Sequence, residues 1–294
     1  MKSINKSLSL ADGRKIGCQI VGQGKPLIYF HGTASSRLEV LLFEKFALEK
    51  GLRIIGIDRP GYGISTYKFR ERLTDFAHDV NQLIKILELK EFSLLSWSGG
   101  GPFLLSFLAL FPEQVTTAIV ASSPALPFDS ATAHNNNQLA RYLLKSRFFG
   151  EISLQLFRSA VLRANGDFNK FLKTEFGKQF SSQWSKEDEK FFNDRNRLGL
   201  IWNAMTEGFR PKESSKTILQ EHRLFLKDFD PSLKNIKQGE KLHIWQGTED
   251  KTCGLANGQK IANEVPRCHM RIFRYEGHSA IFEHLDELGQ ILLE

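Results

Sequence analysis

The 294-residue sequence lacks long apolar runs. None reaches the 18 consecutive apolar residues typical of a membrane-spanning helix. The first ten residues, MKSINKSLSL, contain no signal-peptide apolar core and no small-residue cleavage site. We therefore expect a cytoplasmic protein with no integral membrane association.

Cysteines and blocks of like charge are also scarce. The three cysteines form no C-x-x-C pair, so neither a disulfide framework nor a cysteine metal site is expected. Lysine and arginine number 40 against 33 acidic residues, a net charge of +7, but the two signs are interspersed. This favours a solvated, mildly basic surface with no nucleic-acid partner. An anionic partner, such as a membrane surface or an acidic substrate, remains the alternative.

What the sequence does contain is an alternation of apolar strands and amphipathic helices. It predicts an α/β fold, with a mostly parallel twisted sheet of about eight strands covered by helices on both faces. The predicted strands are 7–10, 15–21, 26–30, 53–57, 92–96, 116–122, 241–247 and 270–275. The predicted helices are 38–50, 74–89, 100–111, 254–264 and 279–293.

The pattern changes after the sixth predicted strand. Residues 124–234 contain no convincing buried strand and show roughly helical spacing. We expect a helical cap or lid inserted into a core formed by 1–123 and 235–294. Several phenylalanines of this insertion either line an apolar substrate site or pack the cap onto the core, namely Phe128, Phe148, Phe149, Phe157, Phe168 and Phe171.

The most informative stretch is SWSGGG, residues 96–101. It lacks the G-x-G-x-x-G spacing of a dinucleotide site and the Gly-Lys-Ser/Thr of a P-loop. It matches G-x-S-x-G with Ser96 in place of the first glycine, the pattern of a serine nucleophile on a sharp strand-to-helix turn. Ser98 is therefore the candidate nucleophile, and the N–H of Gly99 is placed to meet an oxyanion. A glycine-rich turn without chemistry is the alternative.

Two further loops follow predicted strands. HGTASSR, 31–37, comes after the third strand, and the Thr33 N–H is the candidate second oxyanion donor, with His31 structural. DRPGYGIS, 58–65, comes after the fourth strand, and Asp58 is expected to organise that loop.

In this order and at these strand ends, HGTASSR, DRPGYGIS and SWSGGGP resemble the α/β-hydrolase superfamily, in particular bacterial serine hydrolases with a helical cap. The resemblance covers about 6–123 and 235–294. It implies a triad in the chain order serine, acid, histidine, with the histidine on the loop after the last strand.

His278 in YEGHSAIF fits that position among eight histidines. His284, six residues further on, is expected to be a surface side chain in the following helix. The family's glycine–x–x–aspartate loop matches WQGTEDKT, 245–252, and favours Asp250 over Glu249 as the acid.

The family's other acid site, after the sixth strand, holds Ser122-Ser123-Pro124 in this sequence. Asp129 lies too far along the chain to replace the missing acid.

The predicted activity is that of a carboxylesterase-type serine hydrolase (EC 3.1.1) acting on a small-molecule ester with a small to medium, apolar acyl group. It requires no metal and no organic cofactor. Hydrolysis of a lactone, a thioester or a carbon–carbon bond by the same triad is an alternative. A non-catalytic ligand-binding protein of the same fold and a lipase-like enzyme at anionic membrane surfaces are two others. The sequence leaves the oligomeric state open.

Overall fold

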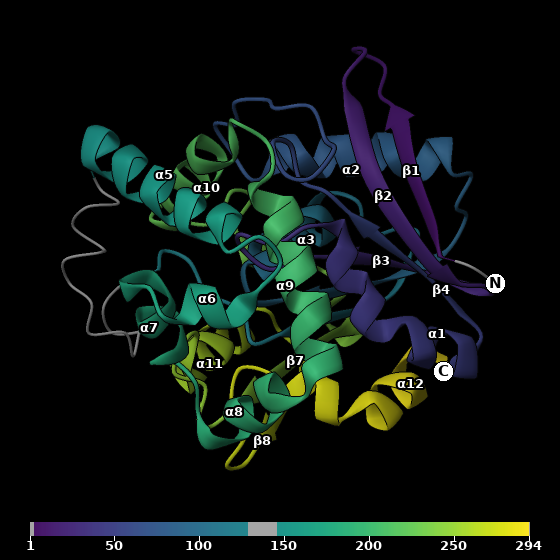
Figure 1. Ribbon diagram of the computed structural model, residues 1–294. Helices are drawn as coiled ribbons and strands as arrows, with labels where there is room; N and C mark the ends of the chain where they lie inside the picture. The colour runs from purple at the N-terminus through teal and green to yellow at the C-terminus, as the bar shows by residue number, and fades with distance from the viewer. Residues whose placement is uncertain (1–2, 129–145, 294) are drawn as a thin grey trace.

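The computed structural model describes residues 3–128 and 146–293, which form an eight-stranded sheet with helices on both faces (Figure 1). The strands are β1 (Ile4–Ser9), β2 (Lys15–Gly22), β3 (Lys25–Phe30), β4 (Leu52–Ile57), β5 (Phe92–Trp97), β6 (Val115–Ala121), β7 (Leu242–Gly247) and β8 (His269–Phe273). Their order in the sheet is β1-β2-β4-β3-β5-β6-β7-β8. Strand β2 is antiparallel to both of its neighbours, and the remaining pairs are parallel. The mostly parallel sheet predicted from the sequence is confirmed.

Alternate residues of each central strand pack on opposite faces of the sheet. Ile28 and Phe30 belong to the apolar cluster under one set of helices, and Leu27 and Tyr29 belong to the cluster under the other. Because both faces are covered, the strands are continuous apolar runs rather than alternating ones. The first set is α2 (Thr74–Ile86), α3 (Gly101–Leu110) and α11 (Gly254–Glu264), and the second includes α1 (Glu44–Lys50) and α12 (Leu285–Leu293).

The helix predicted over 38–50 is wrong in its first half. Residues Arg37–Phe43 form a 3₁₀ helix, and the α-helix begins only at Glu44. A 3₁₀ helix has three residues per turn, so Arg37, Val40 and Phe43 lie on the same, buried face of the segment. Leu41 stays partly exposed.

The helix predicted over 279–293 is also interrupted. Residues Ala280–Glu283 form a 3₁₀ turn that stops at His284, whose φ of −117° is not helical. The His284 Nε2 lies 2.6 Å from Glu276 Oε1, and its ring stacks on Phe273 with centroids 4.1 Å apart. His284 is therefore a partly buried residue that ends a turn, and the prediction of a surface side chain inside a helix is wrong.

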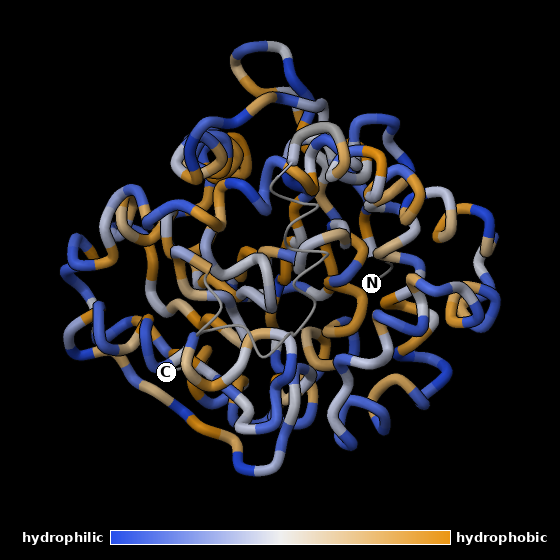
Figure 2. The backbone as a smooth tube through the Cα atoms, turned by 90° about the vertical axis from the view of Figure 1, so that its left-hand side faces the viewer, coloured by the Kyte–Doolittle hydropathy of each residue, from blue (hydrophilic) through white to orange (hydrophobic). Residues whose placement is uncertain are grey.

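Six α-helices lie between β6 and β7 among the described residues, and we call them the insertion helices. They are α5 (Arg147–Arg163), α6 (Phe168–Leu172), α7 (Glu175–Ser181), α8 (Lys186–Asn193), α9 (Arg195–Phe209) and α10 (Ser214–Phe225). In Figure 1 they gather on the side of the molecule away from β1 and β2. Seen from that side, the outer turns of the chain carry many hydrophilic residues (Figure 2). The division of the chain into a core and a cap domain stays a prediction.

Side chains of the 3₁₀ segment and of helix α9 join the insertion to the sheet. The Arg37 Nη1 lies 2.9 Å from both Asp58 Oδ2 and Glu207 Oε1, and all three side chains are buried. The Ser36 hydroxyl donates to the Ala204 carbonyl at 2.8 Å. Asp58 also accepts the Arg37 N–H at 2.7 Å, which agrees with its expected role in organising the loop.

The described residues include no helix with the length and apolar character needed to cross a bilayer. All three cysteines are free thiols. Within the same residues, no group of three or more histidine, cysteine, aspartate or glutamate side chains is arranged to hold a metal ion.

The close contact between the start of α3 and the end of β3 leaves no room for a side chain at Gly100, and this can be tested. A Cβ at this position would lie 2.2 Å from the Phe30 carbonyl oxygen, a backbone atom that cannot swing away. We expect Gly100→Ala to lower the free energy of unfolding by about 1–3 kcal/mol in urea denaturation.

Gly199, inside α9, is the matched control because a Cβ there meets no atom within 4 Å. Gly199→Ala should be neutral or stabilising by up to about 1 kcal/mol. Equal losses in the two variants would contradict the steric explanation.

Candidate active site

The turn after β5 holds Ser98 in an uncommon conformation. Its φ is +54°, in the left-handed region that serine rarely adopts. The buried Ser96 precedes it in the strand, and Gly100 follows it against the Phe30 carbonyl. Small residues two before and two after the serine are what such a bend requires, and a strained residue of this kind is typical of functional sites.

Gly99 lets the loop after β3 approach this turn closely. A Cβ on Gly99 would lie 2.0 Å from Thr33 Oγ1 and 3.0 Å from the Thr33 backbone nitrogen. The two residues predicted to supply oxyanion donors are therefore adjacent in space. They reach this position from different strands because the carboxyl ends of parallel strands share one edge of the sheet.

His278 and Asp250 also meet at this edge. The His278 Nδ1 lies 2.9 Å from Asp250 Oδ2, and the Asp250 side chain is fully buried. Asp250 accepts the N–H groups of Thr252 and Cys253 at 2.8 and 2.9 Å through its other oxygen. Glu249, the alternative acid, is exposed and does not take this place.

The pair shifts the pKa of both members. Burial alone would raise the pKa of Asp250, but the His278 ring and the N–H donors hold it below its ordinary value of 3.8. Burial alone would lower the pKa of His278, but the Asp250 carboxylate outweighs it and raises the pKa above 6.5. Asp250 is thus an anion that favours the imidazolium form of His278.

A third carboxylate, which the sequence reasoning missed, fixes the His278 loop from the insertion. Asp188 on α8 is fully buried and accepts the backbone N–H groups of His278 at 3.1 Å and Ser279 at 2.8 Å. It also accepts the hydroxyls of Ser279 and Ser185 at 2.7 and 2.8 Å. The pattern S-x-x-D at Ser185 indicates a helix N-terminus. It does not indicate that Asp188 also binds His278, which lies 90 residues further along the chain.

Ser98, Thr33 and His278 line one pocket of about 300 Å³. No hydrogen bond joins the Ser98 hydroxyl to His278 in the part of the chain that the structure describes. The Trp97 Nε1 donates to the His278 carbonyl at 2.8 Å, which holds the histidine loop beside the turn. Catalytic hydrogen bonds are often long before substrate binds, so the arrangement suits a nucleophile and its base.

Most of the remaining pocket wall is apolar and mainly aromatic. Among the phenylalanines expected to line a substrate site or to pack the cap, Phe157 lines this pocket. Phe168 and Phe171 are buried among other aromatic rings of the insertion. Phe128 packs against the apolar cluster under α2, α3 and α11, and Phe149 is largely exposed. The side chain of Phe148 and residue Asp129 lie outside the described residues. Three of the five whose side chains are described therefore serve packing. The apolar wall comprises Trp97, Phe157, Phe180, Trp184, Phe192, Ile201 and Met205.

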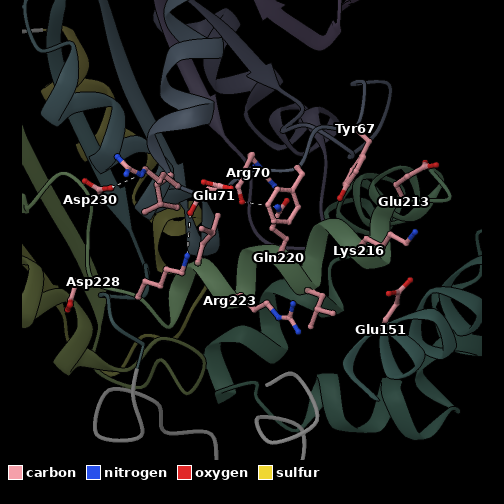
Figure 3. Close-up of a pocket in the computed structure, with 16 residues that line it drawn as sticks. Tyr67, Arg70, Glu71, Glu151, Glu213, Lys216, Gln220, Arg223, Asp228 and Asp230 are labelled. Carbon is pink, nitrogen blue, oxygen red and sulfur yellow. Dashed lines mark hydrogen bonds and ion pairs between the residues drawn. The ribbon is translucent and has the colours of Figure 1, made fainter. Parts of the chain in front are cut away.

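A larger pocket of about 860 Å³ lies beside α10 and the segment 67–73 (Figure 3). It contains none of the predicted catalytic residues. Five carboxylates and five cationic side chains line it, so its charge favours neither an anion nor a cation. The smaller pocket at Ser98 is the candidate active site.

Comparison with known proteins gives independent evidence on the family and the fold of this chain. The family described as alpha/beta hydrolase fold matches residues 25–285. The AB hydrolase superfamily protein YisY of Bacillus subtilis (strain 168) is 24% identical over 277 residues, which cover 93% of this chain and 92% of that protein. The 2-hydroxy-6-oxo-6-phenylhexa-2,4-dienoate hydrolase of Burkholderia cepacia is 22% identical over 280 residues, which cover 93% and 88%. An esterase structure from Exiguobacterium antarcticum superposes with a TM-score of 0.67 at 20% identity, covering 99% of this chain and 98% of that one.

The contact between His278 and Asp250 can be tested without any assay of activity. Asp250→Asn removes the negative charge that raises the pKa of His278, so the burial that remains should lower this pKa. NMR titration of the histidine ring signals measures the shift. Glu249→Gln, which changes the exposed neighbouring acid, should leave the His278 titration unchanged, and a shift of similar size in both variants would contradict the assignment.

Proposed function

Because the chain belongs to the alpha/beta hydrolase fold family, we propose that it is a serine hydrolase that cleaves carboxylic esters with apolar acyl groups. One observation carries the proposal. Ser98, whose φ is +54°, lines the same pocket as His278, and the His278 ring is hydrogen-bonded to the buried Asp250. A nucleophile, a base and the acid that orients the base are the parts that acyl transfer needs.

In the proposed cycle the Ser98 hydroxyl attacks the ester carbonyl while the His278 Nε2 takes its proton. Asp250 accepts a hydrogen bond from the Nδ1–H of the ring and stabilises the imidazolium that forms. The N–H groups of Thr33 and Gly99 accommodate the oxyanion. His278 then gives the proton to the leaving alcohol, and water repeats the steps to release the acid. His278 acts as a base only when neutral, so the rate should rise as the pH passes upward through its raised pKa.

The pocket wall supports an apolar acyl group. Aromatic and aliphatic side chains cover most of it, and a volume of about 300 Å³ suits a short chain or one ring rather than a long lipid. The insertion helices supply most of this wall, which is why we infer that they act as the substrate-selecting cap.

The charge of the pocket favours a neutral ester over an anionic substrate. The described lining residues include no lysine or arginine, and their only carboxyl group belongs to Glu39. The Burkholderia cepacia relative is named for a dienoate, which is a carboxylate anion. In this chain such a group would meet Glu39 and no lysine or arginine among the described lining residues. Carbon–carbon bond hydrolysis of that kind of substrate is therefore the less favoured alternative.

Ser98→Ala tests the proposal directly. We expect kcat/KM for aryl esters to fall by about 10⁴-fold or more, because the nucleophile is lost. An organophosphonate should label Ser98 in the wild-type chain and leave the variant unlabelled. Ser96→Ala is the matched control: this serine lies two residues away, is fully buried and should keep activity within about tenfold.

Other outcomes of the same experiment distinguish the rival functions. Labelling of Ser98 without turnover of any ester or lactone would indicate a ligand-binding protein. Turnover that depends on anionic vesicles and weakens with salt would indicate a lipase-like enzyme.

The size of the pocket gives a second prediction. Along a series of p-nitrophenyl esters, kcat/KM should rise about fourfold per added CH₂ until the pocket is filled, and then fall. Trp184→Ala removes a ring from the wall and so enlarges the pocket, which should move the optimal acyl length to longer chains. Phe176→Ala, which removes a ring that packs on Phe157 but does not line the pocket, should leave the optimum in place. An unchanged optimum in Trp184→Ala would contradict the placement of the acyl group.

A further inference from the structure

The peptide between Gly32 and Thr33 is polarised from its carbonyl side. The Gly32 carbonyl oxygen accepts from the Arg59 Nη2 at 3.1 Å and lies 2.7 Å from the His31 Nδ1. The same peptide group carries the Thr33 N–H, which the proposed function assigns to the oxyanion. Hydrogen bonds that accept at one end of an amide strengthen the donor at its other end.

The neighbouring peptide is held as well, and this determines which N–H remains free. The His31 carbonyl accepts from the Arg59 Nη1 at 2.5 Å, and the Gly32 N–H donates to Glu39 Oε1 at 2.9 Å. Glu39 is buried and also accepts the Tyr29 hydroxyl at 2.7 Å. With the Gly32 N–H occupied, the Thr33 N–H is the donor left to face the Ser98 turn.

His31 completes this arrangement as a neutral ring. Its Nε2 lies 3.4 Å from the Arg59 N–H and therefore acts as the acceptor, which assigns the proton to Nδ1, next to the Gly32 carbonyl. Burial, reinforced by the Arg59 charge, holds the pKa of His31 well below its ordinary value. The ring thus donates to the carbonyl without adding a charge.

Arg59 is in turn fixed by a carboxylate of the insertion. Glu221 on α10 accepts the Arg59 Nε at 2.7 Å and the Nη2 at 3.1 Å, and both side chains are fully buried. Glu221 also accepts the Tyr62 hydroxyl at 2.7 Å and the Arg70 Nη2 at 3.0 Å. Burial raises the pKa of Glu221, but the two guanidinium groups outweigh it and hold the pKa below 4.5, so it remains an anion.

Further hydrogen bonds join helix α10 to the segment that holds Arg70. Figure 3 shows its side chains reaching the segment after the Asp58 loop. The Gln220 Nε2 donates to the Arg70 carbonyl at 2.8 Å, and the Lys227 Nζ, just beyond the helix, lies 3.4 Å from the Glu71 carbonyl.

We propose that Arg59 is a positioning residue of the oxyanion site, and that Glu221 of the insertion holds it there. The guanidinium group binds both carbonyls of the His31–Gly32 segment, which orients the Thr33 N–H toward Ser98 and strengthens it as a donor. The inference rests on the proposed function, because it presumes that an oxyanion forms beside Ser98. Arg59 touches neither substrate nor nucleophile and acts through the peptide.

The test compares Arg59→Lys with Arg37→Lys in the full chain. Both arginines are buried and both pair with a glutamate of the insertion, but Arg37 contacts neither carbonyl of the His31–Gly32 segment. A lysine at position 59 has one ammonium group and cannot bind two carbonyls and a carboxylate in the same fork geometry. We expect Arg59→Lys to lower kcat by about tenfold to a hundredfold, with KM within about twofold.

A trifluoromethyl ketone separates positioning from folding. Ser98 adds to its carbonyl to form a hemiketal oxyanion, with the serine proton passing to His278. In Arg59→Lys the inhibition constant should rise by the same factor by which kcat/KM falls. In Arg37→Lys, whose thermal unfolding midpoint should fall by a similar amount, the inhibition constant and kcat should stay within about threefold of the wild type.

If Arg59→Lys does not fold, Glu221→Gln replaces it. This variant keeps Arg59 but removes the charge that holds it, and the same parallel loss of kcat and ketone affinity is expected. The inference is overturned if the wild-type Ser98 is labelled by an organophosphonate while a folded variant keeps both values within about twofold. Absence of labelling in the wild type would instead overturn the proposed function itself.

Discussion

Close packing around the turn after β5 is the constraint on which the rest of the site depends. A Cβ at Gly100 would lie 2.2 Å from the carbonyl oxygen of Phe30 at the end of β3, and a Cβ at Gly99 or Gly101 would lie 2.0 or 1.9 Å from the hydroxyl of Thr33 or Ser123. Side chains are excluded from these positions, so three loops from different strands converge on Ser98. The left-handed φ of Ser98 follows from the same crowding, because the chain must reverse from strand to helix within a few residues.

Short-range rules explain why much of this was predictable. A strand covered on both faces is a continuous apolar run, which identified β3, β4 and β5 from composition alone. Ser98 follows from the small residues on either side of it. His278 and Asp250 follow from the resemblance to a family that places its base and acid on loops after the last two strands, and the 2.9 Å contact joins the two residues chosen on that ground.

The remaining contacts depend on tertiary structure that no local pattern encodes. Asp188 and Glu221 lie in polar, helical stretches where an acidic residue normally faces water, yet both are fully buried. Their partners lie 90 and 162 residues away along the chain. The 3₁₀ winding of Arg37–Phe43 was also missed, because its leucines fit helical spacing and the contacts of Arg37 with Asp58 and Glu207 are long-range.

Three buried carboxylates, Asp188, Glu207 and Glu221, therefore link the insertion helices to loops of the sheet. A chimera that received this segment from a relative without Glu221 would leave Arg59 as an unpaired cation in the interior, and one without Glu207 would leave Arg37 with Asp58 as its remaining carboxylate. Exchange of the whole segment should therefore cost stability. Changes in substrate preference should arise instead by single replacements in the aromatic wall, where Trp184 and Phe180 have no ionic partner to lose.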